Sequence, residues 1–114
     1  DVTVSCRRKS ESAWCRVYGY DFLAIGQLCN GIGRYDVIFN TVPAPVFTRE
    51  LLYNTKAVII DLASAPGGVD TCAAGELGVK VIHALSLPGK VAPRTAGEII
   101  AGSVKDILTE EGLI

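Results

Sequence analysis

Residues 61–70 read DLASAPGGVD, and this stretch decides the fold. It follows the apolar, largely branched run Ala57–Ile60, which is typical of a strand buried on both faces. Beyond the Pro-Gly-Gly turn, Val69–Leu77 has the composition of a helix, and Gly78 is well placed to end it. A buried strand, a tight turn and a helix are the parts of a βαβ unit, so an α/β fold is expected.

The same alternation of strand and helix extends along the chain. Helices are expected from Ser10 as N-cap to Gly19, at Phe47–Leu52, at Val69–Leu77 and from about Pro93 to Glu110, with a turn-rich stretch at Gly26–Arg34. The expected strands are Val2–Cys6, Phe22–Ile25, Asp36–Thr41, Ala57–Asp61 and Val79–His83. Right-handed crossovers then give a Rossmann-like, doubly wound parallel sheet covered on both faces.

The last expected helix has an apolar stripe and two internal glycines. Ile99, Ile100 and Val104 belong to a pattern with steps of three and four residues. Gly97 and Gly102 each weaken a helix by about 1 kcal/mol relative to alanine. We therefore expect these glycines to allow close packing of the helix on the sheet.

Composition restricts the class of protein. The chain has 114 residues, 49% of them hydrophobic, with a net charge of -1, which is too apolar for a disordered chain and fits one domain. The longest charge-free runs, Phe22–Gly33 and Val37–Thr48, fall short of the about 20 residues that a membrane helix needs. The charges form no broad basic face for nucleic acid. The four cysteines have no zinc-like spacing, so no metal is expected and a reducing cytoplasm is the simplest compartment.

The chain contains no methionine and begins at Asp1, next to an expected strand. A complete bacterial-type translation product begins with methionine. We therefore expect residues 1–114 to be a single partial domain, part of a longer protein.

Ligands of doubly wound folds lie across the carboxyl ends of the strands. The first expected strand is followed by three cations and a hydroxyl, namely Arg7, Arg8, Lys9 and Ser10. Arginine in the slot after the second strand of a dinucleotide-binding fold accommodates the 2′-phosphate of NADP, and its forked donors suit phosphate oxygens. A solvated basic turn is the alternative.

Three later loops supply the remaining candidates for cofactor contact. Thr41, Val42 and Pro43 follow the third strand and could face the nicotinamide ribose, or simply end the strand. The Pro-Gly turns could let a ligand approach backbone N–H groups. The candidates in these two turns are Asp61, Ser64, Gly67 and Gly68 after the fourth strand, and Leu87, Pro88 and Gly89 after the fifth. Lys90 and Arg94 could hold an anion or be ordinary surface cations.

No catalytic group stands out. Asp61 lies at a strand end, and His83 is the only histidine, a residue that titrates near neutral pH. Both are weak candidates for a catalytic role; the alternative for Asp61 is a structural cap of the following loop, and a histidine placed like His83 is more often a packed, hydrogen-bonded residue. The glycines at Gly26–Gly33 precede a strand and open no long helix, so they fail the context of a G-x-G-x-x-G fingerprint.

Two motifs resemble one family closely. Residues 61–70 and residues 87–97 (LPGKVAPRTAG), together with Asn40-Thr41-Val42-Pro43, are similar to the A subunits of dipicolinate synthases. The resemblance covers essentially the whole chain, as the C-terminal part of the family's nucleotide-binding domain. The Thr-x-Pro element is shared with other dehydrogenases, such as shikimate dehydrogenases.

The resemblance implies an NADP-dependent oxidoreductase in the cytoplasm of the sporulating mother cell. It would oxidise a dihydro or hydroxytetrahydro precursor to dipicolinic acid, and its partner would be a flavoprotein-like second subunit. A homo-oligomer is also open, and no nucleic-acid or membrane partner is expected. Alternatives are another NADP-dependent dehydrogenase, of the shikimate or methylene-tetrahydrofolate type, and a non-catalytic nucleotide-sensing module.

The resemblance also implies that a central strand and a Gly-rich pyrophosphate loop lie before Asp1. Without that strand, buried strand edges stay unpaired. The sheet would then need another segment, chain swapping or rearrangement. We expect the 114 residues alone to bind NADP weakly or not at all.

Overall fold

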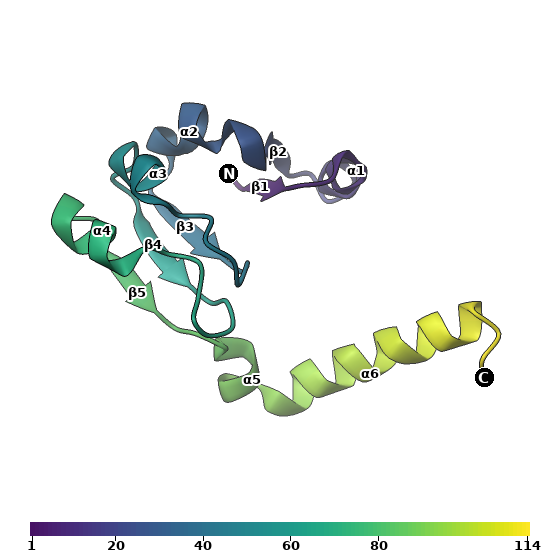
Figure 1. The fold of residues 1–114 in the computed structure, drawn as a ribbon. Coiled ribbons are helices and arrows are strands. Elements are labelled where there is room, and N and C mark those ends of the chain that lie inside the picture. Colours follow the sequence, from purple (N-terminus) through teal and green to yellow (C-terminus); the bar gives the residue numbers. More distant parts are fainter.

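The computed structural model describes residues 1–114, except for the side chain of Pro88, and has a mixed α/β fold (Figure 1). The elements in chain order are β1 (Thr3–Cys6), α1 (Lys9–Val17), β2 (Asp21–Ala24), the 3-10 turn η1 (Ile25–Gln27), α2 (Leu28–Gly31), the 3-10 turn η2 (Ile32–Arg34), β3 (Val37–Asn40), α3 (Arg49–Tyr53), β4 (Val58–Asp61), α4 (Thr71–Leu77), β5 (Val81–His83), α5 (Leu87–Val91) and α6 (Pro93–Glu110). All five strands and the four main helices expected from the sequence are present, most of them with shifted ends, whereas α5 was not expected.

The strands form two parallel sheets rather than one. β1 pairs with β2, and β3, β4 and β5 pair in that order. We call residues 1–24 the two-stranded unit and residues 37–83 the three-stranded unit. The parallel pairing confirms the expected fold class. In the Rossmann order, one further strand would lie between β1 and β3, and the structure shows no pairing between these two strands among the described residues.

The hydrophobic core lies in the three-stranded unit, together with the turn η2 that precedes it. The helices α3 and α4 cover one face of the sheet, where Ile59 and Leu52 are fully buried. The buried apolar residues that make up this core are Ile32, Phe47, Leu51, Leu52, Ile59, Ala73 and Ala74. Strand β4 is central in this sheet, so the apolar run found in the sequence forms the middle of the core.

The opposite face of the three-stranded sheet is open. Val37 and Phe39 on β3 remain 48% and 63% exposed, and Ile82 on β5 is 42% exposed. Alternate residues of a strand point to opposite faces, so these side chains share the face turned away from Ile59. The expected burial of both faces is therefore not met by the described residues.

The helix α6 has the bounds expected from its sequence, but not the expected packing. It adjoins α5 and extends away from both sheets (Figure 1). A Cβ atom added at Gly97 or Gly102 would meet nothing within 4 Å, so the prediction that these glycines allow close packing on the sheet is wrong. Ile99 and Ile100 are 66% and 64% exposed.

Hydrogen bonds of the N-cap residues define where two helices, α4 and α1, begin. Asp70 is the N-cap of α4, where its carboxylate accepts from the Ala73 amide at 3.0 Å. Gly78 ends α4 in the left-handed region at φ 71°, as expected. The N-cap of α1 is Arg8 rather than Ser10, because the Arg8 amide already donates to the Glu11 carboxylate at 3.2 Å.

Among the described residues, no helix combines the length and the apolar character that a bilayer crossing requires.

Candidate functional site

A cavity of about 360 Å³ lies at the carboxyl ends of β3, β4 and β5. Its lining combines three hydroxyl groups with small or apolar residues: Thr41, Leu62, Ala63, Ser64, Ser86 and Gly89. Three residues predicted for cofactor contact are thus brought together, Thr41 and Ser64 from the loops after β3 and β4 and Gly89 from α5. A mainly apolar lining with a few polar groups is typical of small-molecule sites.

Ser86 is one of three lining residues that sequence reasoning missed. Its backbone has φ 59°, in the left-handed region that favours glycine, and its amide donates to the Leu62 and Ala63 carbonyls at 3.2 Å each. An unfavourable backbone conformation held by such hydrogen bonds is often found at functional sites. Leu62 and Ala63 were also missed, although their place directly after β4 could have indicated them.

A second cavity, of about 450 Å³, has three prolines in its wall. Pro43, Pro45 and Pro66 line it with Phe47, Thr48, residues 67–69 and Asp70. Pro43, Gly67 and Gly68, predicted for the cofactor, therefore line this cavity rather than the one around Thr41. The three prolines contribute no backbone N–H donor to this wall.

Asp61 directly precedes Leu62, Ala63 and Ser64 of the first cavity, yet it lines neither cavity. Its side chain is 1% exposed. One carboxylate oxygen accepts from Asn40 Nδ2 at 2.9 Å and from the Ala63 amide at 3.3 Å, and the other accepts from the Gly68 amide at 3.0 Å. A carboxylate held in this way lacks access to a substrate, so the geometry favours the structural alternative over a direct role in binding or catalysis.

Three predicted cofactor contacts from these segments remain, namely Val42, Leu87 and Pro88. Val42 is half-buried and its amide donates to Asn40 Oδ1 at 3.2 Å. Leu87 begins α5 and is 39% exposed. The side chain of Pro88 lies outside the described residues. Neither Val42 nor Leu87 is among the residues that line the two cavities.

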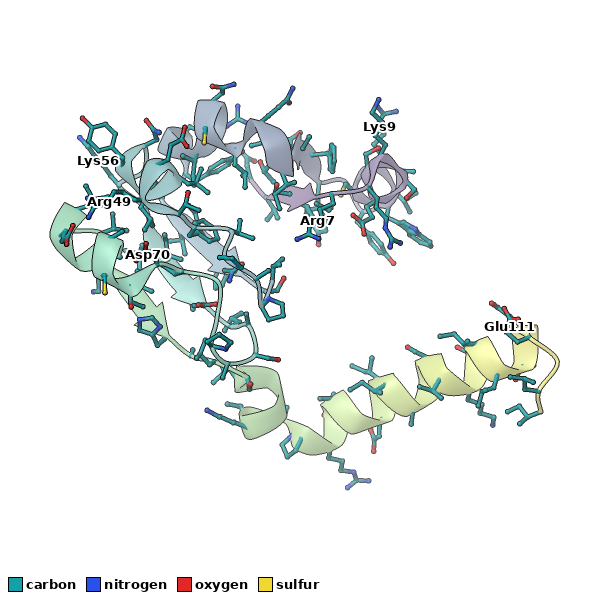
Figure 2. All side chains as sticks on the ribbon, viewed as in Figure 1. Arg7, Lys9, Arg49, Lys56, Asp70 and Glu111 are labelled. Atoms are coloured by element: carbon teal, nitrogen blue, oxygen red, sulfur yellow. The ribbon has the colours of Figure 1, made fainter. Side chains whose placement is uncertain are left out.

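The basic candidates lie on the two-stranded unit. Arg7, Arg8, Lys9 and Ser10 are all exposed, at the junction of β1 and α1. Arg7 and Lys9 point in opposite directions from this junction, so the basic run is not one continuous patch (Figure 2). Positive charge at the N-terminus of α1 opposes the helix dipole, which makes this an electrostatically unfavourable place for cations unless an anion is bound.

Cys6 precedes this basic run. Burial raises the pKa of the Cys6 thiol to about 11, with smaller contributions from the Glu11 carboxylate and the Cys15 thiol. A thiol with a raised pKa is a poor nucleophile at neutral pH. The geometry therefore supports the view of Cys6 as a packed small residue.

His83 ends β5 and is exposed. Its position pairs with Asp61 in the parallel register, but it is not among the residues lining either cavity. Arg94 forms an ion pair with Glu98 at 3.0 Å, one turn along α6, which accounts for this cation as a surface residue. Among the described residues, no group of three or more His, Cys, Asp or Glu side chains could hold a metal ion.

Comparison with known proteins gives consistent results. No family model matches the chain. The A subunit of dipicolinate synthase from Bacillus subtilis (strain 168) is 42% identical over 96% of the chain. The solved structures of the dipicolinate synthase A subunits from Bacillus halodurans and Bacillus subtilis are 36% and 34% identical, and both superpose with a TM-score of 0.76.

The resemblance expected from the sequence is therefore confirmed. The two structural matches cover 94% and 96% of the chain, which supports a Rossmann-like arrangement of its strands. The chain spans 38% of the length of the curated relative and 37% to 38% of the solved chains.

Proposed function

We propose that this relative of the dipicolinate synthase A subunits is the nucleotide-binding portion of an NADP-dependent oxidoreductase. Residues 1–114 would be one partial dinucleotide-binding domain. The observation that carries the proposal is the cavity at the carboxyl ends of β3, β4 and β5, lined by Thr41, Ser64 and Ser86. This edge of a doubly wound sheet is where such folds bind their ligands.

The residues present fit two ends of NADP. A cavity of about 360 Å³ is at the small end of ligand pockets, about 300–1,000 Å³, and suits the nicotinamide with part of its ribose. The exposed guanidinium groups of Arg7 and Arg8 suit the 2′-phosphate. The 114 residues contain no G-x-G-x-x-G turn for the pyrophosphate, so these two ends would contribute only part of the binding free energy.

The mechanism follows from these positions. Bound NADP would supply a hydride acceptor for oxidation of the ring of a dihydro dipicolinate precursor, which would also release one proton; a hydroxytetrahydro precursor would lose water in addition. The hydroxyls of Thr41, Ser64 and Ser86 orient polar groups at the cavity, while Leu62 and Ala63 exclude water from one side. Orientation of this kind reduces the entropy that must be lost in the transition state.

The curated relative is one of the subunits of its synthase, which implies that it has a partner. For the present chain we propose a flavoprotein-like second subunit, with a homo-oligomer as a further possibility. The role would place the chain in the cytoplasm of the mother cell of a sporulating bacterium.

A nucleotide-sensing module is the second candidate. The described residues that line the cavity include no titratable side chain, and a sensor would need none. If the chain is a sensor, we expect it to assemble with a partner when the nucleotide binds, without turnover. If it is an enzyme, we expect reduction of NADP when the ring precursor is added.

The test is isothermal titration of NADP and NAD into the full-length polypeptide that carries these residues. We expect Arg7→Ala and Arg8→Ala each to weaken NADP binding by about 10- to 100-fold, because hydrogen bonds to charged groups are worth about 1.5–3 kcal/mol. NAD affinity should stay the same. Arg16→Ala, on the last turn of α1, is the matched control. An unchanged NADP-to-NAD ratio in all three variants would remove the basic run from the site.

A further inference from the structure

Asn40 and Asp61 form a buried polar pair at the strand ends. They are the last residues of β3 and β4, lie opposite each other in the parallel register, and are 3% and 1% exposed. Asn40 Nδ2 donates to an Asp61 carboxylate oxygen at 2.9 Å. Buried polar groups of this kind are costly unless they are satisfied, and here both side chains find partners.

Each member of the pair also holds backbone groups of the loop that follows its strand. Asn40 Nδ2 donates to the Val42 carbonyl at 3.1 Å, and Asn40 Oδ1 accepts from the Val42 amide at 3.2 Å. Asp61 accepts from the amides of Ala63 and Gly68. The pair thereby joins the loop after β3 to the loop after β4.

The Pro-Gly-Gly turn closes over this pair. A Cβ atom on Gly68 would lie 2.5 Å from Asn40 Nδ2 and 2.6 Å from the Val42 carbonyl oxygen, and one on Gly67 would overlap the Asp61 carboxylate. Gly67 also has φ 85°, in the left-handed region. The two glycines are therefore needed for internal contacts with Asn40, Val42 and Asp61, which differs from the expected role of admitting a ligand to backbone N–H groups.

The two joined loops carry the residues that line the cavity. Thr41 directly follows Asn40, while Leu62, Ala63 and Ser64 directly follow Asp61. The Leu62 amide donates to the Asn40 carbonyl at 2.8 Å. We therefore expect a change in the pair to shift Thr41 relative to Ser64.

We propose that Asn40 and Asp61 are positioning residues, which fix the distance between Thr41 and Ser64 and so determine affinity for the nicotinamide end of the dinucleotide. Neither residue contacts the cofactor or takes part in proton transfer. The proposal rests on the proposed NADP-binding function. It adds that the Asn40–Asp61 pair holds the nicotinamide end of the site in place before the ligand binds.

The experiment compares two ligands in the full-length polypeptide, NADP and adenosine 2′,5′-bisphosphate, which lacks the nicotinamide half. Asp61→Asn places an amide NH₂ against either Asn40 Nδ2 or the Gly68 amide. We expect Kd for NADP to rise by about tenfold or more and Kd for adenosine 2′,5′-bisphosphate to change by less than about twofold. Asp70→Asn is the matched control, because asparagine and aspartate are equivalent N-caps.

The exchanged double variant Asn40→Asp with Asp61→Asn sharpens the test. It restores one donor and one acceptor between the two positions, so it should recover part of the NADP affinity lost in Asp61→Asn, which is a coupling that independent sites lack. Equal loss of both ligands in Asp61→Asn would overturn the positioning role and show general damage to the fold. A fall in kcat with unchanged Kd for NADP and loss of one limb of the pH–rate profile would overturn it in favour of a catalytic Asp61.

A second measurement does not depend on the folding of any variant. Amide hydrogen exchange of the wild-type protein should show Val42 and Gly68 protected before any ligand is added, with little further protection from NADP. Protection that appears only with NADP would overturn a preformed pair. Wild-type protein that binds neither ligand would contradict the proposed function itself, while the protection result would still report on the pair.

Discussion

The two-stranded and three-stranded units differ in how far each completes its own structure. The three-stranded unit contains nearly all of the buried apolar side chains, together with the satisfied pair of Asn40 and Asp61. In the two-stranded unit, Cys15 is the one described residue that is buried. The aromatic residues Trp14 and Tyr18 stack on each other there and are both 65% exposed.

This difference teaches that the two proposed ends of the nucleotide site have different physical supports. The cavity rests on a sheet with its own core, so its geometry is fixed locally. The basic run rests on a pair of strands with little buried area, so its position depends on what else packs against β1 and α1. Local stability varies within proteins in this way, and ligand-binding segments are often at the low end.

The largest effect is expected from a substitution in the core, which tests the difference in packing between the two units. Leu52→Ala removes a side chain with 0% exposure from the core, and we expect the free energy of unfolding to fall by about 2–5 kcal/mol. Val17→Ala in the two-stranded unit, where Val17 is 76% exposed, should change it by less than about 0.5 kcal/mol. Urea denaturation of both variants gives the comparison. Similar losses would show that Val17 is buried in solution and that the two units are equally well packed.

An intermediate effect concerns the two helix starts. Asp70→Ala removes the acceptor for the Ala73 amide and should cost about 1 kcal/mol. Arg8→Ser gives α1 the side-chain cap that it lacks and should add up to about 1 kcal/mol. Under the proposed function the same Arg8→Ser change weakens NADP binding. Thermal unfolding with and without NADP measures both, and a variant that is less stable yet binds NADP normally would reverse our assignment of Arg8.

The smallest expected effect concerns the thiols. Cys29 and Cys72 are exposed, so they should react with a disulfide reagent at pH 8 before Cys6, because burial raises the pKa of the Cys6 thiol to about 11. In the unfolded chain this thiol ionises near its ordinary pKa of 9.0. The folded state therefore binds the proton more tightly, and the resulting stability is complete below pH 9 and lost as the pH rises through 11.

Peptide mapping after timed exposure to the disulfide reagent identifies which thiol has reacted. Cys6 reacting as fast as Cys29 would show that the β1–α1 junction opens readily. Cys6→Ser is the control for the pH dependence, since it removes the titrating thiol.

The sequence predicted the parallel strands and most of the helices because these depend on local pattern. Pro93 and the apolar steps of three and four residues gave the bounds of α6 correctly. Its packing could not be predicted in this way, since the same apolar stripe fits any covering partner. The open face at Phe39 has the same origin, because a pattern shows that a face is apolar but not what covers it.

The candidate site was predicted in part for a related reason. The rule of strand carboxyl ends selected Thr41, Ser64 and Gly89, which the structure brings together in one cavity; their contact with a cofactor stays a prediction. The same rule also selected Asp61, which lines neither cavity. The rule does not give the register of β3 and β4, and this register places Asn40 opposite Asp61. Gly67 and Gly68 were interpreted as room for a ligand, whereas the Asp61 carboxylate lies against Gly67, and the Asn40 side chain and the Val42 carbonyl lie against Gly68.

One measurement tests most directly the claim that the two units hold opposite ends of one dinucleotide. Amide chemical shifts of the isotopically labelled, full-length polypeptide are followed during titration with adenosine 2′,5′-bisphosphate and then with NADP. We predict that the first ligand shifts the amides of residues 7–10 alone, and that NADP adds those of Thr41, Ser64 and Gly89. Shifts at Thr41 and Ser64 with the first ligand, or none there with NADP, would contradict the account.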